Sequence, residues 1–325
     1  MQPKAMFRRS DTREVKVGGV SVGGGAPVSV QTMCNADPRD AAGLSEQIAA
    51  CAALGCDIIR LTVPDVESAK VFGEVRKSSP IPMVADIHFD YRCALAAIEA
   101  GADALRLNPG NIGPRENVQA VARLAKEKKV PIRIGVNAGS LERDLAAEVA
   151  TGERRAPLLV KSAMRHLKLL ENEGFYDVVI SAKASNVAET IEVYRMLADT
   201  TDCPLHLGVT EAGTFLPGTV RNSVALGILL SEGIGDTIRV SLTDTPEKEV
   251  AVGLEILRAL GLRAPGPSVT SCPTCGRTKC DVKGVAEAVE SGLAGVASAM
   301  GLRCVRFPRV AVMGCVVNGP GEAKG

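Results

Sequence analysis

The sequence contains no tryptophan, and aromatic residues make up only 3% of it. Its net charge is only +1, because lysine and arginine are almost balanced by aspartate and glutamate. Proteins that bind nucleic acid need excess positive charge, and many sites for bases, flavins or nicotinamides use stacked aromatic side chains. The sequence also lacks a G-x-G-x-x-G turn after a strand. These shortages argue against a nucleic-acid-binding protein and against a dinucleotide-dependent enzyme.

Long apolar runs are also missing. No stretch is long enough to span a bilayer, and the polar segment from Met1 to Arg13 has no signal-peptide core. We therefore expect a cytoplasmic protein with no membrane role. Its ten cysteines are then expected to be ligands or small core residues, because disulfides are rare in a reducing compartment.

One pattern recurs along the first four-fifths of the chain: a short β-branched run with a polar end, followed by a helical stretch rich in Ala, Leu, Glu and Lys. The predicted strands cover 27–31, 58–63, 83–87, 104–107, 132–136, 178–181, 205–209 and 237–241. Helices are predicted at 44–54, 91–100, 118–128, 188–197 and 247–260. Eight strand–helix units favour an α/β fold of the (β/α)₈ TIM-type barrel class over an open doubly wound sheet.

The pattern ends at Pro265-Gly266-Pro267, which predicts a linker. We expect the barrel to occupy residues 1–264 and a small α+β domain to occupy 265–325. In the small domain the sequence predicts a strand at 268–271, a helix at 285–300 and a strand at 309–313.

Polar residues dominate the inward positions at the late ends of the predicted barrel strands. Five of them are cationic and one is acidic, whereas barrel interiors are normally filled with Val, Ile and Leu. Burying unpaired cations is costly, so a polyanion such as a diphosphate is the expected ligand. The alternative is that acids such as Asp57, Asp86 or Asp103 hold some arginines in structural pairs. The inward set is Arg60, Thr62, Asp86, His88, Arg106, Asn108, Arg133, Asn137, Ser181, Lys183, His206, Thr210, Arg239 and Ser241.

Two late motifs have the composition of a split metal site. One is Cys272-Pro273-Thr274-Cys275, and the other is Gly314-Cys315-Val316-Val317-Asn318-Gly319-Pro320-Gly321-Glu322. Three thiolates and one carboxylate favour an iron–sulfur cluster in which one iron is held loosely through oxygen. A CPxCG turn is also half of a zinc ribbon, so a structural zinc site is the alternative.

The remaining cysteines and one histidine give weaker signals. Four cysteines in or beside apolar segments are predicted to fill the core, namely Cys51, Cys56, Cys93 and Cys203. Cys34 follows the first strand and is ambiguous, and Cys280 and Cys304 are expected not to be ligands. His166, in a helical stretch, is expected on a helix surface.

Seven motifs in one order, from about Val15 to the end, resemble the family of bacterial 4-hydroxy-3-methylbut-2-en-1-yl diphosphate synthases of the methylerythritol phosphate pathway. The motifs are Val84-Ala-Asp-Ile-His-Phe-Asp-Tyr91, Arg106-Leu-Asn-Pro-Gly-Asn-Ile-Gly113, Arg133-Ile-Gly-Val-Asn-Ala-Gly-Ser140, Leu207-Gly-Val-Thr-Glu-Ala-Gly213, Leu230-Ser-Glu-Gly-Ile-Gly-Asp-Thr237 and the two cysteine motifs above.

The resemblance implies a TIM-type barrel with a small [4Fe–4S] domain in an iron–sulfur oxidoreductase. The implied reaction is reductive ring opening and dehydration of 2-C-methyl-D-erythritol 2,4-cyclodiphosphate, with two electrons from flavodoxin or ferredoxin. Glu211 matches the acid/base, and Cys272, Cys275, Cys315 and Glu322 match the cluster ligands. The diphosphate contacts match Arg60, Arg106, Arg133, Lys183 and Arg239, assisted by Asn108, Asn137 and Ser241.

Two further expectations concern assembly. The linker Leu262–Ser268 can span at most about 25 Å at roughly 3.5 Å per residue, and it leaves from the end of the barrel opposite the predicted site. We therefore expect a head-to-tail homodimer in which each cluster domain caps the partner's barrel, as the resemblance also implies. Family members usually continue past the glutamate, whereas this sequence stops at Gly325, so a shortened cluster domain is expected. One alternative function is a phosphate-ligand-binding barrel with a structural zinc knuckle and no redox role. Another is an RNA-binding scaffold, but this sequence lacks the basic, aromatic surface that RNA binding requires.

Overall fold

The computed structural model describes residues 7–137, 139, 141–264, 269–299 and 310–315. The chain forms two compact units, Met1–Leu260 and Gly261–Gly325. Among the described helices, none combines the length and the apolar character that crossing a bilayer requires.

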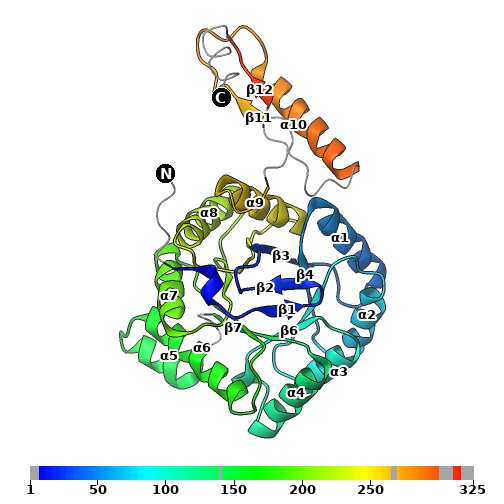
Figure 1. Cartoon of the computed structure of the whole chain (residues 1–325), viewed down its shortest axis with the longest axis vertical. Helices are drawn as coiled ribbons and strands as arrows, with labels where there is room; N and C mark the ends of the chain where they lie inside the picture. The colour runs from blue at the N-terminus through cyan, green and yellow to red at the C-terminus, as the bar shows by residue number, and fades with distance from the viewer. Residues whose placement is uncertain (1–6, 138, 140, 265–268, 300–309, 316–325) are drawn as a thin grey trace. The chain divides into compact units, whose positions relative to one another are not determined.

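The first unit is a barrel of parallel strands, seen end-on in Figure 1. The strands are β3 (Ser29–Met33), β4 (Ile58–Thr62), β5 (Met83–Asp86), β6 (Ala104–Leu107), β7 (Ile132–Asn137), β8 (Val178–Lys183), β9 (His206–Leu207) and β10 (Thr237–Ile238). They pair in the order β8-β7-β6-β5-β4-β3-β10-β9, and a bridge from Ile180 to Leu205 closes the ring. All eight predicted strands are confirmed, although β9 and β10 are shorter than predicted.

A helix follows each strand and packs outside the ring. These helices are α1 (Ala41–Leu54), α2 (Val66–Arg76), α3 (Tyr91–Glu99), α4 (Arg115–Lys128), α6 (Arg155–Glu171), α7 (Val187–Thr200), α8 (Phe215–Ser231) and α9 (Pro246–Ala259). Short polar residues fix several helix starts: Asp40, Asp65 and Asp90 each accept a backbone N–H of the first helical turn. The barrel class predicted from the sequence is confirmed.

A β-hairpin that the sequence analysis did not predict precedes the barrel. Its strands are β1 (Val15–Val17) and β2 (Val20–Val22), and Figure 1 shows them lying across the ring. The hairpin packs against residues near the amino-terminal ends of barrel strands, namely Ile58, Val84, Ala104 and Val179. It therefore plugs the end of the barrel opposite the predicted site.

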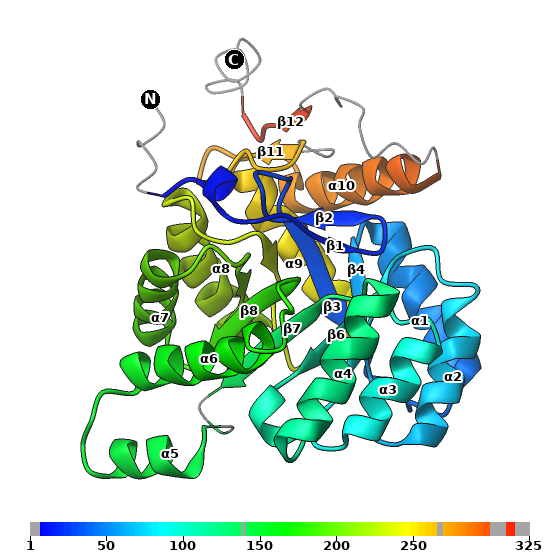
Figure 2. The ribbon, with the colours of Figure 1, turned by 60° about the horizontal axis from the view of Figure 1, so that its bottom comes forward.

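The connection after β7 is longer than the others and carries an additional helix, α5 (Arg143–Ala150). Figure 2 shows α5 outside the helix ring, next to α6. Ion pairs from Arg165 to Asp144 (2.7 Å) and from Lys161 to Glu148 (3.0 Å) attach it to α6. A short 3₁₀ helix, η2 (Pro109–Asn111), follows β6, and another, η1 (Arg9–Asp11), precedes β1.

The second unit contains β11 (Val269–Ser271), α10 (Val282–Ala299) and β12 (Val310–Val312). The two strands are parallel, and Ser271 pairs with Val312. The two strands and the helix predicted for this unit are confirmed, with α10 beginning earlier than predicted.

Candidate active site

Five cationic side chains gather inside the barrel, from Arg133 near the start of its strand to Arg239 just beyond the end of its own. Arg60 lies on β4, Arg106 on β6, Arg133 on β7 and Lys183 on β8, while Arg239 directly follows β10. Arg133 is buried and the others are half-buried. Arg106 and Arg133 are register partners on adjacent strands, so like charges are held side by side. The structure therefore brings together the cations that the strand periodicity placed inward.

Two buried carboxylates balance part of this charge. Asp86 lies 3.2 Å from Arg106 Nη1 and 3.6 Å from Arg60 Nε. Glu249, on α9, lies 3.1 Å from Arg239 Nε and also accepts hydrogen bonds from Thr32 Oγ1 (2.6 Å) and the Leu242 N–H (2.9 Å). Burial alone would raise the pKa of Asp86, but Arg60 and Arg106 lower it below its usual value.

The acids proposed from the sequence as alternative partners are only partly correct. Asp86 does pair with two of the five cations, Arg60 and Arg106. Asp57 instead accepts the Val30 N–H at 2.8 Å, and Asp103 pairs with Arg76 at 2.7 Å. Structural pairing therefore accounts for some of the cations but not for the whole set.

Arg133 and Lys183 form no ion pair within the described residues. Arg133 donates to the Gln31 side chain through Nη1, while its buried Nη2 has no hydrogen-bond partner there. Burial, followed by repulsion from Arg60 and Arg106, lowers the pKa of Arg133 well below its usual value. Burial also lowers the pKa of Lys183, with Arg239 and Arg60 adding to the effect. Such uncompensated cations are an anion-binding arrangement.

His206 lies among these cations and is fully buried. Burial, then the charges of Arg133 and Lys183, lower its pKa well below the usual value, so the ring is neutral. Its Nδ1 lies 3.4 Å from Thr237 Oγ1, and its Nε2 has no hydrogen-bond partner among the described residues. His206 is therefore a neutral, buried imidazole with one unpartnered nitrogen among the described residues.

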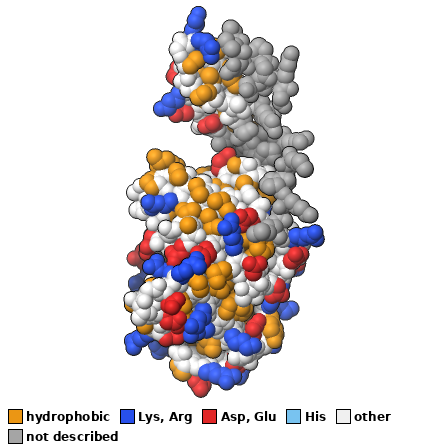
Figure 3. Space-filling model, turned by 90° about the vertical axis from the view of Figure 1, so that its left-hand side faces the viewer, with side chains coloured by type: hydrophobic (Ala, Val, Ile, Leu, Met, Phe, Trp, Pro, Cys, Tyr) orange, Lys and Arg blue, Asp and Glu red, His pale blue; other side chains and the backbone are white. Residues whose placement is uncertain are grey.

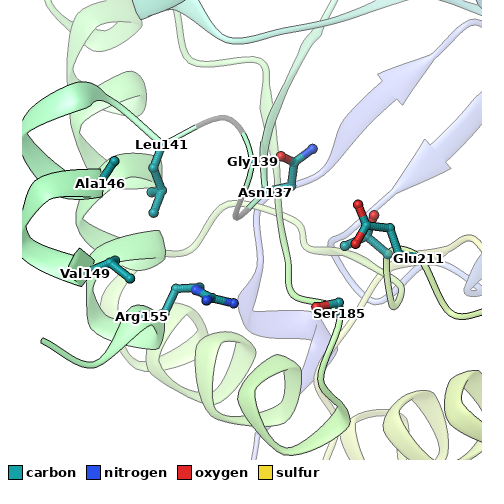
Figure 4. A pocket seen from close by; sticks show the side chains of 9 residues that line it. Asn137, Gly139, Leu141, Ala146, Val149, Arg155, Ser185 and Glu211 are labelled. Atoms are coloured by element: carbon teal, nitrogen blue, oxygen red, sulfur yellow. The ribbon is translucent and has the colours of Figure 1, made fainter. Parts of the chain in front are cut away.

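A cavity of about 420 Å³ opens at the ends of β7, β8 and β9, within the size range of small-ligand sites (Figure 4). Asn137, Thr210 and Glu211, all predicted site residues, line it. Arg155 at the start of α6 and Ser185 after β8 also line it. Figure 4 shows Arg155 extending into the cavity from one side, with Ser185 and Glu211 on the other.

Glu211 has an unusual backbone conformation. Its φ of 53° lies in the left-handed region, which costs a residue with a side chain about 1–2 kcal/mol. The flanking chain is fixed by hydrogen bonds from the Thr210 N–H to Ala184 O (3.1 Å) and from Arg221 Nη1 to Ala212 O (2.8 Å). The exposed carboxylate of Glu211 is thus held at the cavity by a strained, well-anchored loop.

The other predicted contacts lie around the same barrel end. Asn108 is buried, and its Oδ1 accepts the Gly135 N–H at 2.9 Å. Ser181 is buried, whereas Thr62 and Ser241 are half-buried at strand ends. His88 is exposed and contributes to the electrostatic environment of Asp86.

Four site residues were missed or misplaced by sequence reasoning. Glu249, Arg155 and Ser185 were not singled out, and His166, predicted on a helix surface, is only 1% exposed. Helical periodicity places a residue on a face but does not identify which face meets the barrel mouth. The sequence did contain a signal for Glu249. An acid in the first turn of a helix can reach back to a cation at the end of the preceding strand.

The second unit brings the cysteine motifs to one edge. Cys272 directly follows β11 and donates its N–H to Val312 O (3.0 Å), while Cys315 comes shortly after β12. Thr278 binds both the N–H and the carbonyl of Cys275. No three His, Cys, Asp or Glu side chains of the described residues are close enough to hold a metal. Cys272 and Cys315 nevertheless follow the two paired strands, and thiolates are the ligands that an iron–sulfur cluster prefers. The predicted fourth ligand, Glu322, lies outside the described residues.

Among the other cysteines, the four that were predicted to fill the core have the expected burial. Cys51, Cys56, Cys93 and Cys203 are buried, which confirms their predicted place in the core. Burial raises the pKa of Cys51 and Cys56 to about 12, so both remain thiols. Cys34 is also buried and Cys280 is exposed, while Cys304 lies outside the described residues.

Comparison with known families identifies both units. Residues 12–254 match the GcpE TIM-barrel domain, and residues 268–325 match the GcpE protein C-terminal domain. The chain belongs to the GcpE family. Its GcpE relatives include proteins named 4-hydroxy-3-methylbut-2-en-1-yl diphosphate synthase (flavodoxin) from two bacteria. The Geobacter sulfurreducens protein is 54% identical over 97% of this chain and 87% of its own length; that of Maridesulfovibrio salexigens is 53% identical over 98% and 86%.

Solved structures with little sequence identity share the barrel of this GcpE chain. Dihydropteroate synthase of Yersinia pestis has a TM-score of 0.54 at 13% identity, covering 76% of this chain and 98% of its own. Phospho-2-dehydro-3-deoxyheptonate aldolase of Thermotoga maritima has a TM-score of 0.53 at 9% identity, covering 80% and 76%. These similarities show the barrel fold alone.

Glu249→Gln tests whether the carboxylate on α9 stabilises the barrel by pairing with Arg239. Removing it leaves the half-buried Arg239 without its counter-ion, so we expect the free energy of unfolding to fall by about 3 kcal/mol. Glu255→Gln, on the same helix, removes an exposed partner of Arg258 and should change it by less than about 0.5 kcal/mol. Urea unfolding followed by circular dichroism measures both variants. Equal losses would show that Glu249 has no special structural role.

Proposed function

We propose that this chain catalyses the reductive ring opening and dehydration of 2-C-methyl-D-erythritol 2,4-cyclodiphosphate to 4-hydroxy-3-methylbut-2-enyl diphosphate. Two electrons and two protons enter, one ring C–O bond and one C–OH bond break, and water leaves. The chain is an iron–sulfur oxidoreductase of isoprenoid precursor biosynthesis. The observation that carries the proposal is the cluster of five cations inside the barrel, because it suits the diphosphate in its relatives' name.

The five cations supply substrate binding in this proposal. Arg133 and Lys183, which have no carboxylate partner in the described part of the chain, receive the most highly charged part of the diphosphate. Arg60, Arg106 and Arg239 are held by Asp86 and Glu249 and present their remaining N–H groups to it. Neutral hydrogen bonds to the substrate come from Asn108, Asn137, Thr210 and Ser241. The other proposed substrate-binding residues, besides the five cations, are Asp86, His88 and His206.

Glu211 is proposed to protonate the departing oxygen. Its carboxylate lines the cavity beside Asn137, and its strained backbone fixes its direction. A proton held there can be delivered to an oxygen of a substrate whose diphosphate sits on the cations. A preorganised acid reduces the reorganisation needed during the reaction.

We propose that Cys272, Cys275, Cys315 and Glu322 hold a [4Fe–4S] cluster. The parallel register of β11 and β12 brings the two cysteine segments to one edge, which supports this ligand set. When bound, the cluster supplies electrons one at a time and a Lewis-acidic iron. Flavodoxin is the proposed electron donor, as the relatives' names include it, and ferredoxin is the alternative. The cytoplasmic location stays a prediction.

Glu211→Gln tests the reaction. Wild-type protein purified without oxygen should contain iron and sulfide and convert the cyclodiphosphate with reduced flavodoxin. The variant should keep its iron and bind substrate, but its kcat should fall at least about a hundredfold, because general acid catalysis contributes about that much. Colourless, folded wild-type protein with stoichiometric zinc and no turnover would instead favour the phosphate-binding barrel with a structural zinc knuckle.

Lys183→Met tests the anion site. The variant should bind the cyclodiphosphate about 10–100-fold more weakly, since one charge-assisted contact is lost. An anion raises the lowered pKa of Lys183, so binding to the wild type should take up more protons than binding to the variant does. Calorimetry in two buffers of different ionisation enthalpy measures both effects. Lys161→Met, which removes a half-exposed lysine from α6, is the control; identical proton uptake in all three proteins would contradict the assignment.

We propose that the active protein is a head-to-tail homodimer. In addition to the short linker, α8 carries exposed apolar side chains at four-residue spacing: Leu216 (70%), Val220 (53%), Val224 (46%) and Ile228 (38%). Figure 3 faces the side on which Figure 1 places α7 and α8 and shows apolar areas among charged ones. Subunits commonly bury such surfaces.

Mixing two inactive variants tests the dimer. Glu211→Gln disables the barrel and Cys315→Ser disables the cluster unit, so neither homodimer should turn over. If each site combines the barrel of one chain with the cluster unit of its partner, the mixed dimer holds one intact site. Subunit exchange should therefore restore activity, to at most about a quarter of wild type from random pairing. A purified mixed dimer without activity would show that each site is built within one chain.

A further inference from the structure

His166 occupies a position that its sequence context did not suggest. It lies on α6 and is 1% exposed. Its ring faces the loop after β6 rather than solvent, because the Gly110 N–H donates to its Nδ1 at 3.0 Å. A buried histidine that accepts a backbone N–H outside its own helix fixes the distance between two elements.

The approach of ring and loop is close. A methyl group on Gly110 would lie 2.6 Å from His166 Cε1, so glycine is required at this position. Since Nδ1 accepts, a neutral ring carries its proton on Nε2. Burial lowers the pKa of His166, the carboxylate of Glu142 opposes this effect, and the charge of Arg165 adds to it. The ring is therefore a neutral acceptor at physiological pH.

The second ring nitrogen faces the neighbouring loop. His166 Nε2 lies 3.6 Å from Glu142 Oε1 and has no hydrogen-bond partner among the described residues. Glu142 directly precedes α5, and its other oxygen accepts a hydrogen bond from Ser162 Oγ on α6 at 2.7 Å. His166 thus sits between the loop that follows β6 and the loop that follows β7.

Both loops adjoin the proposed substrate site. Gly110 comes two residues after Asn108, whose side chain is bonded to Gly135 on β7. Leu141, next to Glu142, lines the cavity together with Asn137 and Glu211. A shift of either loop away from α6 would move proposed substrate contacts, and small displacements of such groups reduce binding and rate strongly.

We propose that His166 is a positioning residue for the substrate site: as a neutral acceptor for the Gly110 N–H, with Glu142 beside its Nε2, it fixes the loops after β6 and β7 against α6. The inference rests on the proposed function for its kinetic consequence. Its structural consequence, a protected Gly110 amide, does not depend on which substrate is bound.

Two substitutions separate the hydrogen bond from the burial of the side chain. His166→Asn places its Oδ1 near the position of Nδ1 and keeps an acceptor for Gly110, whereas His166→Leu is apolar and removes it. Lys168→Leu, which changes an exposed lysine on the same helix, is the control. All three are made in the full-length chain with its cluster.

Hydrogen exchange followed by mass spectrometry reads the loop directly. In His166→Leu, the peptide containing Gly110 should exchange at least about tenfold faster, because the amide loses its acceptor. His166→Asn and Lys168→Leu should exchange as the wild type does. Should His166→Leu fail to fold, a wild-type exchange rate in Gly110→Ala, which forces the loop off the ring, would overturn the proposal equally well.

Steady-state kinetics read the functional consequence. We expect KM for the cyclodiphosphate to rise about tenfold in His166→Leu with a smaller change in kcat, and to return close to wild type in His166→Asn. Faster exchange with unchanged KM would leave His166 structural and overturn the positioning role. Absence of turnover in wild-type protein would count against the proposed function instead, and the exchange data would still decide whether His166 holds the loop.

Discussion

The barrel unit depends on how it handles buried positive charge. Five cations lie inside the barrel, and within the described residues two carboxylates, Asp86 and Glu249, pair with them. Removing cations from water is costly, so the folded state stores an electrostatic preference for an added anion. The rest of the barrel, including the hairpin plug and the capped helices, provides the rigidity that holds this unfavourable arrangement. The positive charge inside the barrel therefore both favours anion binding and lowers the stability of the fold.

The placement of the two carboxylates shows how the cost is divided. Asp86 and Glu249 hold Arg60, Arg106 and Arg239. Arg133 and Lys183 are left with lowered pKa values and no ion pair in the described chain. An incoming anion gains most where compensation is least, so the local imbalance directs the ligand toward these two residues. A full set of counter-ions would give a more stable barrel with a weaker site.

The sequence predicted the features that follow from strand and helix periodicity, namely the barrel strands and their inward-facing residues. Parallel strands buried on both faces appear as β-branched runs, and their polar late residues marked the cations from Arg60 to Arg239. The hairpin at Val15–Val22 was missed because three-residue strands contain too few residues to show alternation. Glu249, Arg155 and His166 were missed because they reach the site from helices, and a helical pattern does not reveal which turn meets a loop. A metal site shared by the two cysteine motifs could be proposed because both motifs follow predicted strands.

The same distinction explains where the chemistry lies. Strand positions supply charge with fixed geometry, since their backbone is determined by hydrogen bonds on both sides. Glu211 lies beyond the last residue of β9 in a left-handed conformation, and its loop is anchored from α8 through Arg221. His166 similarly anchors the loop after β6 from α6. Helices outside the barrel thus hold the loops that strands cannot, and the proposed catalytic geometry depends on side chains of these helices.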